Sequence, residues 1–539
     1  MYSIVDMSPR DLGQPYWARF VLVIAIAIAV RWLFFTGFLG SDEVTYTKVA
    51  VEIAQGHLLP YSFAGAWRYG VNLPNALSIW LFGVSEFSSS LWGFMCSVGE
   101  VGLIFAVAWR LWGQRAAVAA SLIAAFVPLH VHLAGRTMAD PPLAFFITLT
   151  FILFWIAEQR RHITRYVVAG FAAGFVFWIK ESVGILFLGV FVLYALLLRR
   201  WNFKWLWMAG GWALMVGANL ALFWYITGNP LHIFQVFRET AHLTRTVLVT
   251  GASSPGFYLW YLFLDIRHVS FMAYLALGGL LIWAWRWRMQ RVPAPATGYV
   301  VLWAVGLMAI FSLTPLSLDP FLFITKQTNY MMIFMAPLCL MSGYFLAQLS
   351  RNAVALIAVP YLVSAMVLSA LEQQAIHVFV ANSKASVAFA RAHRDTPVFA
   401  TPNAFSAGLY AATLQPDGKG VKPMRSIERM MSDLTAMRAA NHVDGSRLIA
   451  YAIVDTHTLG WGEKRVIKSI NQVPDCWVKV ETLQPTGYGV GATVIEYLHL
   501  AVGRLPMGLA ERAHKFTTPL LRPLPAYVYA IPGNCEFSL

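Results

Sequence analysis

The sequence predicts a polytopic α-helical membrane protein that carries a small soluble α/β domain at its C-terminal end. Of its 539 residues, 58% are hydrophobic and only 12% are charged, whereas soluble domains average about 25% charged residues. Apolar runs recur through the first two thirds of the chain, and ~20 such residues suffice for a helix to cross the ~30 Å of hydrocarbon. Beyond about residue 372 the hydrophobicity falls, and short strand-like runs replace the long apolar ones.

Each long apolar run is interpreted as one membrane-crossing helix, which gives about eleven such helices. The expected ranges are 17–38, 89–112, 115–134, 141–157, 165–180, 183–199, 205–227, 257–284, 298–315, 329–349 and 352–371. The transmembrane domain therefore covers residues 1–371, and the soluble domain covers 372–539.

Basic residues mark every second turn between these helices. They are Arg110 and Arg115, then Arg160, Arg161 and Arg165, then Arg199, Arg200 and Lys204, then Arg286, Arg288 and Arg291, and finally Arg351. Since Lys and Arg accumulate in cytoplasmic loops, this alternation predicts a cytoplasmic N-terminus. The first outer loop, about 39–88, and the soluble domain then lie on the extracytoplasmic side. Because topology explains the net charge of +14, a nucleic-acid partner is not expected.

The soluble domain is expected to contain five strands and one helix. The strands are Thr396–Ala400, Arg447–Val454, Trp477–Leu483, Val490–Tyr497 and Ala526–Ile531, and the helix is Ser426–Ala440. Cys476 and Cys535 lie in this domain. In an oxidising compartment they could pair as a disulfide, and the sequence leaves the paired and the free states open.

Two adjacent carboxylates, Asp42 and Glu43, follow the first apolar run directly. The next residues are expected to form an amphipathic helix, because Tyr46, Val49 and Ile53 share one helical face. One interpretation makes Asp42 an N-cap and Glu43 a first-turn acid that suits the helix dipole. The other gives the pair a catalytic function.

Further ionisable residues fall on the same outer side. Asp140 precedes two prolines at the start of a helix, where an N-cap is again the alternative interpretation. Lys180 and Glu181 occupy a very tight turn, and ionisable groups near membrane depth are functional candidates by default. Arg31, in the outer half of the first helix, is expected to snorkel outward.

The ordered motifs resemble the GT-C glycosyltransferases, and more narrowly the protein O-mannosyltransferase and aminoarabinose-transferase group. The similar segments are the acidic pair with its amphipathic helix ending in Gln55-Gly56, Arg136-x-x-x-Asp140, Lys180-Glu181, and Lys326 through Pro337. They span about residues 1–370. The resemblance implies a GT-C fold and a polyprenyl-phosphate-linked sugar as donor. The acceptor would be a hydroxyl of a glycan, lipid or protein.

Chemical roles follow from the displacement that this resemblance implies. Attack by a hydroxyl on the anomeric carbon requires a base, for which Asp42 is the candidate, with Glu43 and Asp140 orienting the acceptor or tuning Asp42. The departing lipid phosphate requires cationic or hydrogen-bonding partners, and Arg68, Lys326 and Tyr330 are the candidates. The candidates for other substrate contacts are Tyr46, Arg136, Lys180 and Glu181.

Two departures limit what the resemblance transfers. The aminoarabinose transferases carry Lys-Pro-Pro in the first outer loop, where this chain has Trp67-Arg68-Tyr69-Gly70-Val71-Asn72-Leu73-Pro74. Their Lys-Gly is Lys180-Glu181 here. The acceptor specificity of that group is therefore not expected to hold.

No cofactor is required by this chemistry, and a divalent metal lacks support in the sequence. Asp-x-Asp, the Walker loop and His-Glu-x-x-His are all absent. His130 and His132 form a pair without further ligands, which is a weak metal signal. Gly487, Gly489 and Gly491 favour a hairpin turn between two strands over a phosphate-binding loop.

Two other functions compete with the transferase. A transporter or flippase of lipid-linked substrates predicts charges at mid-membrane depth and broken, repeat-related helices. A membrane scaffold would use the C-terminal domain to bind a partner. The sequence contains no Asn-x-Ser/Thr acceptor site, which favours a bacterial inner membrane over the endoplasmic reticulum.

Overall fold

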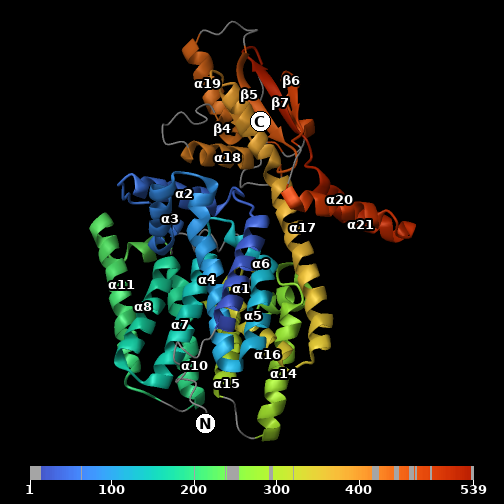
Figure 1. Ribbon diagram of the computed structural model, residues 1–539. Helices are drawn as coiled ribbons and strands as arrows, with labels where there is room; N and C mark the ends of the chain where they lie inside the picture. Colours follow the sequence, from blue (N-terminus) through green and yellow to red (C-terminus); the bar gives the residue numbers. More distant parts are fainter. Residues whose placement is uncertain are drawn as a thin grey trace. The chain divides into compact units, whose positions relative to one another are not determined.

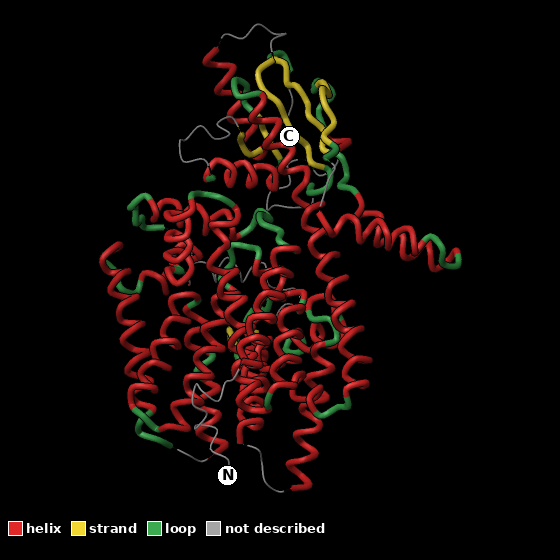
Figure 2. The backbone as a smooth tube through the Cα atoms, viewed as in Figure 1, coloured by secondary structure: helices red, strands yellow, loops and turns green. Residues whose placement is uncertain are grey.

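The computed structural model describes residues 14–61, 64–198, 201–236, 238, 254–290, 295–319, 321–414, 424–441, 448–459, 467, 470–485 and 489–535. The chain divides into two compact units. The first comprises Met1–Phe35, Glu52–Ser78 and Ser90–Ser369, and the second comprises Thr36–Val51, Ile79–Ser89 and Ala370–Leu539. Helices dominate the first unit, and the five-stranded sheet lies in the second (Figure 2).

The first unit is a bundle of helices that run roughly alongside one another (Figure 1). They are α1 (Gln14–Leu33), α4 (Glu86–Trp112), α5 (Gln114–Phe126), α6 (Pro128–Ala134), α7 (Asp140–Arg160), α8 (Ile163–Ile179), α9 (Glu181–Leu186), α10 (Gly189–Leu198), α11 (Trp205–Thr227), α14 (Met272–Gln290), α15 (Pro295–Leu313), α16 (Met332–Ala347) and the start of α17 (Arg351–Ala392). Among the described residues, seven helices are long and apolar enough to cross a membrane, or eight if the bent α5–α6 pair counts as one. The multi-pass architecture is confirmed, and the number eleven stays a prediction.

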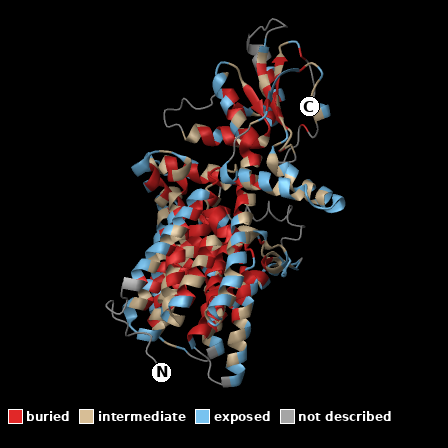
Figure 3. Cartoon of the chain, turned by 45° about the vertical axis from the view of Figure 1, so that its right-hand side comes forward, coloured by how far each residue is buried: buried red, intermediate tan, exposed pale blue. Residues whose placement is uncertain are grey.

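The outward-facing side chains of this bundle are largely apolar. Large residues such as Val192, Leu196, Leu214, Trp224 and Leu281 are exposed, and Figure 3 shows the contrast between buried and exposed faces along the helices. Extensive exposed apolar surface marks an interaction surface, and on spans of this length the partner is the hydrocarbon of a bilayer.

Small residues allow α8 and α11 to pack closely. A Cβ added at Gly211 of α11 would lie 2.5 Å from the carbonyl oxygen of Val167 in α8. The neighbouring Gly210 has open space at the same position. Helices in membranes associate through such small residues, because lipid supplies no hydrophobic driving force between them.

The expected single helix over 257–284 is wrong. The segment forms α13 (Phe257–Leu259), a π-helical turn η4 (Trp260–Leu264), a 3-10 turn η5 (Ile266–His268) and then α14. Arg267 forms an ion pair with Asp265, with 2.6 Å between Nη2 and Oδ2, and the left-handed φ of 53° at Ser270 interrupts the helix.

Arg31 does not snorkel outward, contrary to expectation. It is fully buried, and it donates from Nε to Ser97 Oγ at 2.8 Å and contacts His130 Nδ1 from Nη2 at 2.6 Å. His130 Nε2 lies 2.8 Å from Glu100 Oε2, and Thr148 donates to the other Glu100 oxygen at 2.8 Å. Burying charges is costly unless they are paired and hydrogen-bonded, and this network meets that requirement.

The amphipathic helix after the first apolar run is confirmed as α2 (Asp42–Ala54), with Tyr46 and Val49 buried. It is followed by a 3-10 turn, η2 (Ala64–Trp67), and by α3 (Tyr69–Phe82). Helix α3 was not expected. It lies close to α8, since a Cβ added at Gly70 would stand 2.8 Å from Ile179 Cγ1.

The second unit contains a mixed five-stranded sheet in the order β4-β3-β5-β7-β6. Its strands are β3 (Val398–Ala400), β4 (Met424–Ser426), β5 (Leu448–Asp455), β6 (Val478–Leu483) and β7 (Ala526–Pro532). Strand β3 pairs in parallel with β4 and β5, and β7 pairs antiparallel with β5 and β6. A separate antiparallel pair, β1 (Pro315–Leu318) and β2 (Phe321–Phe323), belongs to the first unit.

Alternate residues of these strands face opposite sides of the sheet. One hydrophobic cluster joins Val398, Ala400 and Ile453 to α17 and α18 (Pro402–Thr413). The other joins Phe399 and Ala452 to a 3-10 turn, η7 (Ile427–Arg429), and to α19 (Met430–Asn441). The sheet therefore lies between two helical layers.

Four of the five expected strands correspond to β3, β5, β6 and β7, and the expected helix 426–440 corresponds to η7 and α19. The expected strand Val490–Tyr497 is wrong, because it lies within α20 (Gly489–Val502), which α21 (Met507–Leu521) follows. The expected Gly turn is partly outside the described residues, and Gly489 and Gly491 belong to the first turn of α20.

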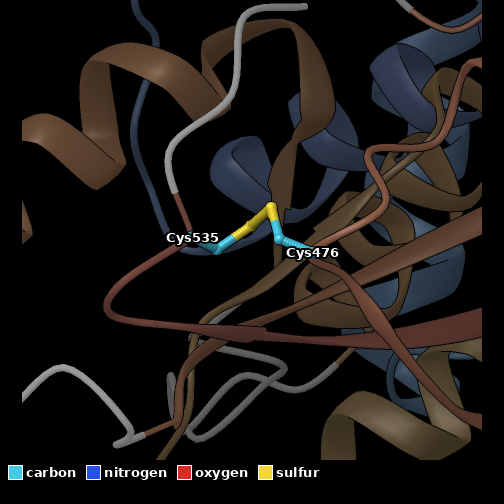
Figure 4. Close-up of a disulfide and its surroundings, with 2 residues drawn as sticks. All are labelled: Cys476 and Cys535. Carbon is cyan, nitrogen blue, oxygen red and sulfur yellow. A yellow bond between two sulfur atoms is a disulfide. The ribbon is translucent and has the colours of Figure 1, made fainter.

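Cys476 and Cys535 form a disulfide, with 5.4 Å between their Cα atoms (Figure 4). The pairing that the sequence left open is therefore present. It ties the segment before β6 to the end of β7, across a sequence separation of 59 residues. Cys96 and Cys339 are buried free thiols.

Candidate active site

Asp140 is the first residue of α7, and its carboxylate is buried. Oδ2 accepts a hydrogen bond from Asn329 Nδ2 at 2.9 Å. Oδ1 is also buried and has no hydrogen-bond partner in the described part of the chain. The N-cap position is Ala139, without a side-chain cap bond, so capping does not explain Asp140. A half-satisfied buried carboxylate is suited to receiving a substrate hydroxyl.

Lys180 and Tyr330 are brought together from distant parts of the chain. Lys180 has extended backbone geometry between α8 and α9, and Tyr330 lies in the 3-10 turn η6 (Thr328–Met331) before α16. The ammonium nitrogen of Lys180 stands 3.5 Å from the centroid of the Tyr330 ring. This cation–π contact fixes the ring one residue from Asn329, the partner of Asp140.

Glu181 begins α9, and only 5% of the residue is exposed. Its Oε1 atom has no hydrogen-bond partner in the described part of the chain. The positive charges of Arg68 and Lys180 act on this carboxylate electrostatically. Arg68, from the segment between η2 and α3, therefore belongs to the same group.

Tyr258 of α13 joins this group, although no sequence motif points to it. It is fully buried and lies close enough to Tyr330 and Asp140 to interact with them electrostatically. Its hydroxyl has no hydrogen-bond partner among the described residues. The bundle thus gathers Arg68, Glu181, Lys180, Tyr330, Asn329, Asp140 and Tyr258, which we call the bundle constellation.

Arg136 and Lys326 each make a contact with a residue close to them in the sequence. Arg136 Nη1 lies 3.3 Å from His132 Nε2. Lys326 donates from Nζ to the carbonyl oxygen of Ile324 at 3.1 Å and lies 5.3 Å from the Phe323 ring centroid. Burial lowers the pKa of the Lys326 ammonium below its ordinary value of 10.5, because desolvation disfavours the charged form.

In the second unit, Glu43 is buried and Asp42 is half-buried at the start of α2. Oε2 of Glu43 accepts a hydrogen bond from the backbone N–H of Ser41 at 3.1 Å. Glu43 therefore contributes to the structure of the turn. Tyr46 is buried on the same helix. The sequence placed these three residues correctly on an amphipathic helix, and their catalytic roles stay predictions.

Tyr410 of α18 is the central aromatic residue near this end of α2. Its ring stacks on Phe38 with 4.5 Å between centroids, and its hydroxyl lies 3.5 Å from Ser89 Oγ. Burial raises the pKa of Tyr410, and the nearby Glu86 and Glu43 charges add to that rise. No sequence motif pointed to Tyr410, because its partners come from segments far away in the chain.

His130 and His132 contact different residues. His130 contacts Glu100 and Arg31, whereas His132 contacts Arg136. Within the described residues, no group of three or more His, Cys, Asp or Glu side chains is arranged to hold a metal ion.

Comparison with known proteins yields a family match within the bundle. A family described as dolichyl-phosphate-mannose-protein mannosyltransferase matches residues 71–224. An undecaprenyl phosphate-alpha-4-amino-4-deoxy-L-arabinose arabinosyl transferase of Pseudomonas paraeruginosa is 26% identical over an alignment of 342 residues, which covers 58% of this chain and 56% of that protein. The corresponding protein of Edwardsiella ictaluri is 27% identical over 330 residues, with 58% and 57% covered. The alignments thus span little more than half the length of these curated relatives.

Solved structures extend the similarity to most of the chain. ArnT from Cupriavidus metallidurans in the apo state matches with a TM-score of 0.52 at 17% identity, over 86% of this chain and 96% of that one. The same protein bound to undecaprenyl phosphate matches with a TM-score of 0.54 at 18% identity, over 83% and 94%. The resemblance predicted from the sequence is therefore confirmed: this chain is similar in sequence to the aminoarabinose transferases and has their GT-C fold.

Proposed function

We propose that this protein is an integral membrane glycosyltransferase that moves a sugar from a polyprenyl-phosphate donor to a hydroxyl acceptor. The observation that carries this proposal is the bundle constellation, in which Lys180 contacts Tyr330 while the adjacent Asn329 binds Asp140. Three supporting comparisons are the mannosyltransferase family match, the arabinosyl transferase relatives and the undecaprenyl-phosphate-bound ArnT structure.

The cations of the first unit would bind the donor phosphate. Arg68 offers planar, bidentate pairing to phosphate oxygens, whereas Lys326 is a compact point charge. Tyr330 offers a hydroxyl donor, and its ring is held by Lys180. As the glycosidic bond breaks, negative charge builds on the phosphate, and donors fixed in advance stabilise that charge without reorganising.

Asp42 would be the general base. The acceptor oxygen attacks the anomeric carbon, its proton passes to the Asp42 carboxylate, and the bond from the anomeric carbon to the phosphate oxygen breaks. The polyprenyl phosphate keeps that electron pair, so a direct displacement inverts the anomeric centre. Glu43 and Asp140 would orient the acceptor, and Tyr46, Arg136, Lys180 and Glu181 would complete the substrate contacts.

The reaction would take place on the extracytoplasmic side of a bacterial inner membrane. The alternating basic turns support this orientation. The Cys476–Cys535 disulfide supports it independently, because disulfides persist in oxidising compartments. We propose residues 1–371 as the catalytic membrane domain and 372–539 as an extracytoplasmic domain.

A comparison of cells with and without this protein tests the proposal. Mass spectrometry of lipid-linked sugars and envelope glycans should show that one polyprenyl-phosphate sugar accumulates while one glycan modification disappears. That pair of changes would name both the sugar and the acceptor. Unchanged donor and glycan pools in cells that lack the protein would contradict the proposal.

Two structural features favour transport of a lipid-linked substrate as the alternative. Helices α5 and α6 form a broken pair bent by 59°, and Arg31, His130 and Glu100 are ionisable groups buried in the bundle. Broken helices and buried charges are typical of transporters. The three side chains bind one another, however, which a structural network also explains. Vesicles containing the purified protein should leave a fluorescent polyprenyl-phosphate sugar in its original leaflet if transfer is the function.

A further inference from the structure

Helices α20 and α21 form a hairpin that extends away from the five-stranded sheet of the second unit (Figure 1). They pack against each other, and His499 Nδ1 lies 3.2 Å from His514 Nδ1 and 2.8 Å from Thr517 Oγ1. Most of the remaining surface of the hairpin is exposed (Figure 3).

Large apolar side chains make up much of that exposed surface. Met507 is 81% exposed, Phe516 78% and Tyr497 70%, and Leu500 and Leu509 are also exposed. A helix that presents such residues to water carries a cost, because moving apolar surface out of water is favourable. Within the described part of the chain, no other segment covers these side chains.

Two hydrogen bonds attach the base of the hairpin to adjacent residues of α17. The backbone N–H of Gly491, in the first turn of α20, donates to Gln373 Oε1 at 3.1 Å. Gln374 Nε2 donates to the carbonyl oxygen of Leu520, at the end of α21, at 2.9 Å. Both glutamines are almost completely buried. Gly491 is required for this approach, since a Cβ there would lie 2.7 Å from the carbonyl oxygen of Ala370.

The composition of α17 changes at these attachment points. The apolar part of α17 runs over 353–371 and ends at Glu372, Gln373 and Gln374. A helix rises 1.5 Å per residue, so the attachment points lie only a few Å beyond the last apolar residue. If the apolar part of α17 crosses a bilayer, the hairpin begins at the height of the lipid headgroups.

The charged residues of the hairpin indicate which kind of surface would cover its apolar side chains. Arg504, Arg512, Lys515 and Arg522 are exposed, against the exposed acids Glu496 and Glu511. Basic residues beside an apolar helical face are the signature of a helix in the membrane interface, and an anionic lipid surface attracts Lys and Arg side chains.

We propose that the α20–α21 hairpin docks on the surface of a bilayer that contains anionic phospholipid. Its exposed apolar side chains insert at the boundary between headgroups and acyl chains, and its Arg and Lys side chains bind lipid phosphates. This contact would hold the second unit at a fixed height above the membrane. The inference is independent of the transfer reaction.

Site-directed fluorescence on the full chain tests this docking. The variants Phe516→Cys, Thr518→Cys and Thr435→Cys receive an environment-sensitive label, since Cys96 and Cys339 are buried and the other two cysteines are bonded. Each labelled protein is placed in vesicles of phosphatidylcholine and phosphatidylglycerol with a nitroxide on the lipid. Thr518 and Thr435 are exposed controls, on the polar face of α21 and on α19.

Docking predicts that lipid nitroxides quench the label at position 516 much more strongly than the labels at 518 and 435. Replacing phosphatidylglycerol with phosphatidylcholine should reduce that difference. Equal quenching at all three positions would overturn the proposal. A label at 516 that is shielded from water but not quenched, with energy transfer between labelled copies, would instead identify a second copy of the chain as the occupant.

A charge-reversal variant gives an independent measurement. Arg512→Glu combined with Lys515→Glu should remove the dependence of quenching at 516 on anionic lipid, whereas Glu511→Gln should keep it. Hydrogen exchange of β5 and β7 verifies that the sheet stays folded in each variant. If the charge-reversed protein kept the full dependence on phosphatidylglycerol, the proposed lipid contact would be wrong.

Discussion

Lys180 and Tyr330 make the contact that joins the α8–α9 break to the start of α16. Their 3.5 Å separation places a cation against a ring whose hydroxyl is a candidate donor to phosphate. The ring and the hydroxyl of Tyr330 therefore have separable roles, which substitution can distinguish.

Tyr330→Phe keeps the ring on Lys180, whereas Tyr330→Leu removes it. A desolvated cation–π contact is worth ~2 kcal/mol, so Tyr330→Leu should raise KM for the donor by more than ~10-fold. Tyr330→Phe should raise it less, because only the hydroxyl is lost. Donor titrations of both purified variants measure this difference, and equal effects would show that the ring contact carries no binding energy.

Asn329 should act through Asp140. Asn329→Ala removes the hydrogen bond to Asp140 Oδ2, and Oδ1 has no partner in the described part of the chain, so the carboxylate should lose its orientation. A displacement of ~1 Å at such a residue costs ~10²-fold in rate, and kcat should fall more than KM changes. Asn352→Ala, at an exposed position of α17, is the matched control and should retain full activity.

Binding of the donor phosphate should weaken at alkaline pH through Lys326. Because burial lowers its pKa below 10.5, the ammonium loses its charge at a lower pH than an ordinary lysine does. Polyprenyl-phosphate affinity should therefore fall as the pH rises through that lowered pKa. Lys326→Arg should remove the alkaline loss, since Arg stays protonated.

The lowered pKa of Lys326 has the opposite effect on stability, which increases where the affinity for the donor falls. Between the lowered pKa and 10.5 the unfolded chain binds more protons at this position than the folded one, so the contribution of Lys326 to the unfolding free energy rises with pH. A loss of affinity in that window is thus not caused by titration of Lys326 destabilising the fold. Calorimetry of donor binding and thermal unfolding in the same buffers separate the two effects.

The charged residues of the bundle constellation and Tyr330 were predictable, whereas Tyr258 and Asn329 were not. Asp140, Lys180 and Glu181 stand out because ionisable groups within apolar sequence are costly. Neither Tyr258 nor Asn329 stands out in the sequence, because tyrosine is frequent in this chain and asparagine carries no charge. Only the fold brings the two residues to Asp140. Arg31 was placed wrongly, because its partners Ser97, Glu100 and His130 lie on other helices.

At the scale of elements, α8 and α11 depend on a close approach at Gly211. Gly211→Ala should destabilise the bundle by ~1–3 kcal/mol, because the new methyl group overpacks against a backbone carbonyl that cannot move freely. Gly210→Ala, one residue earlier with open space around it, should be neutral or slightly stabilising. Thermal unfolding in detergent compares the two, and equal stabilities would contradict the packing described.

Long apolar helices were predictable from the sequence, whereas helices that depend on partners were not. Residues 490–497 include Val490, Thr493, Val494 and Ile495, whose β-branched side chains favour a strand. They form α20 because Gly491 packs on α17 and the rest of the helix packs on α21. The break between α13 and α14 had a local signal, since Asp265 and Arg267 interrupt an apolar run.

At the scale of the whole molecule, composition and charge alternation predicted a multi-pass helical membrane domain followed by an α/β domain. They did not predict that α17 continues as one helix through residue 371 to Ala392. Nor did they predict that residues 36–51 and 79–89 join the second unit. These features depend on contacts between distant segments, such as Phe38 with Tyr410, that leave no periodic signal.

Transfer by the purified protein tests the central claim most directly. The chain is reconstituted with the polyprenyl-phosphate sugar that accumulates in cells lacking it, together with the acceptor so identified, and mass spectrometry follows both products. The native protein should release polyprenyl phosphate and form the inverted glycoside, and Asp42→Asn should be slower by ~10²-fold or more. Asp395→Asn, an exposed carboxylate after α17, should behave as the native protein does. An unconsumed donor with the native protein, or equal rates with Asp42→Asn, would contradict the proposed reaction or its proposed base.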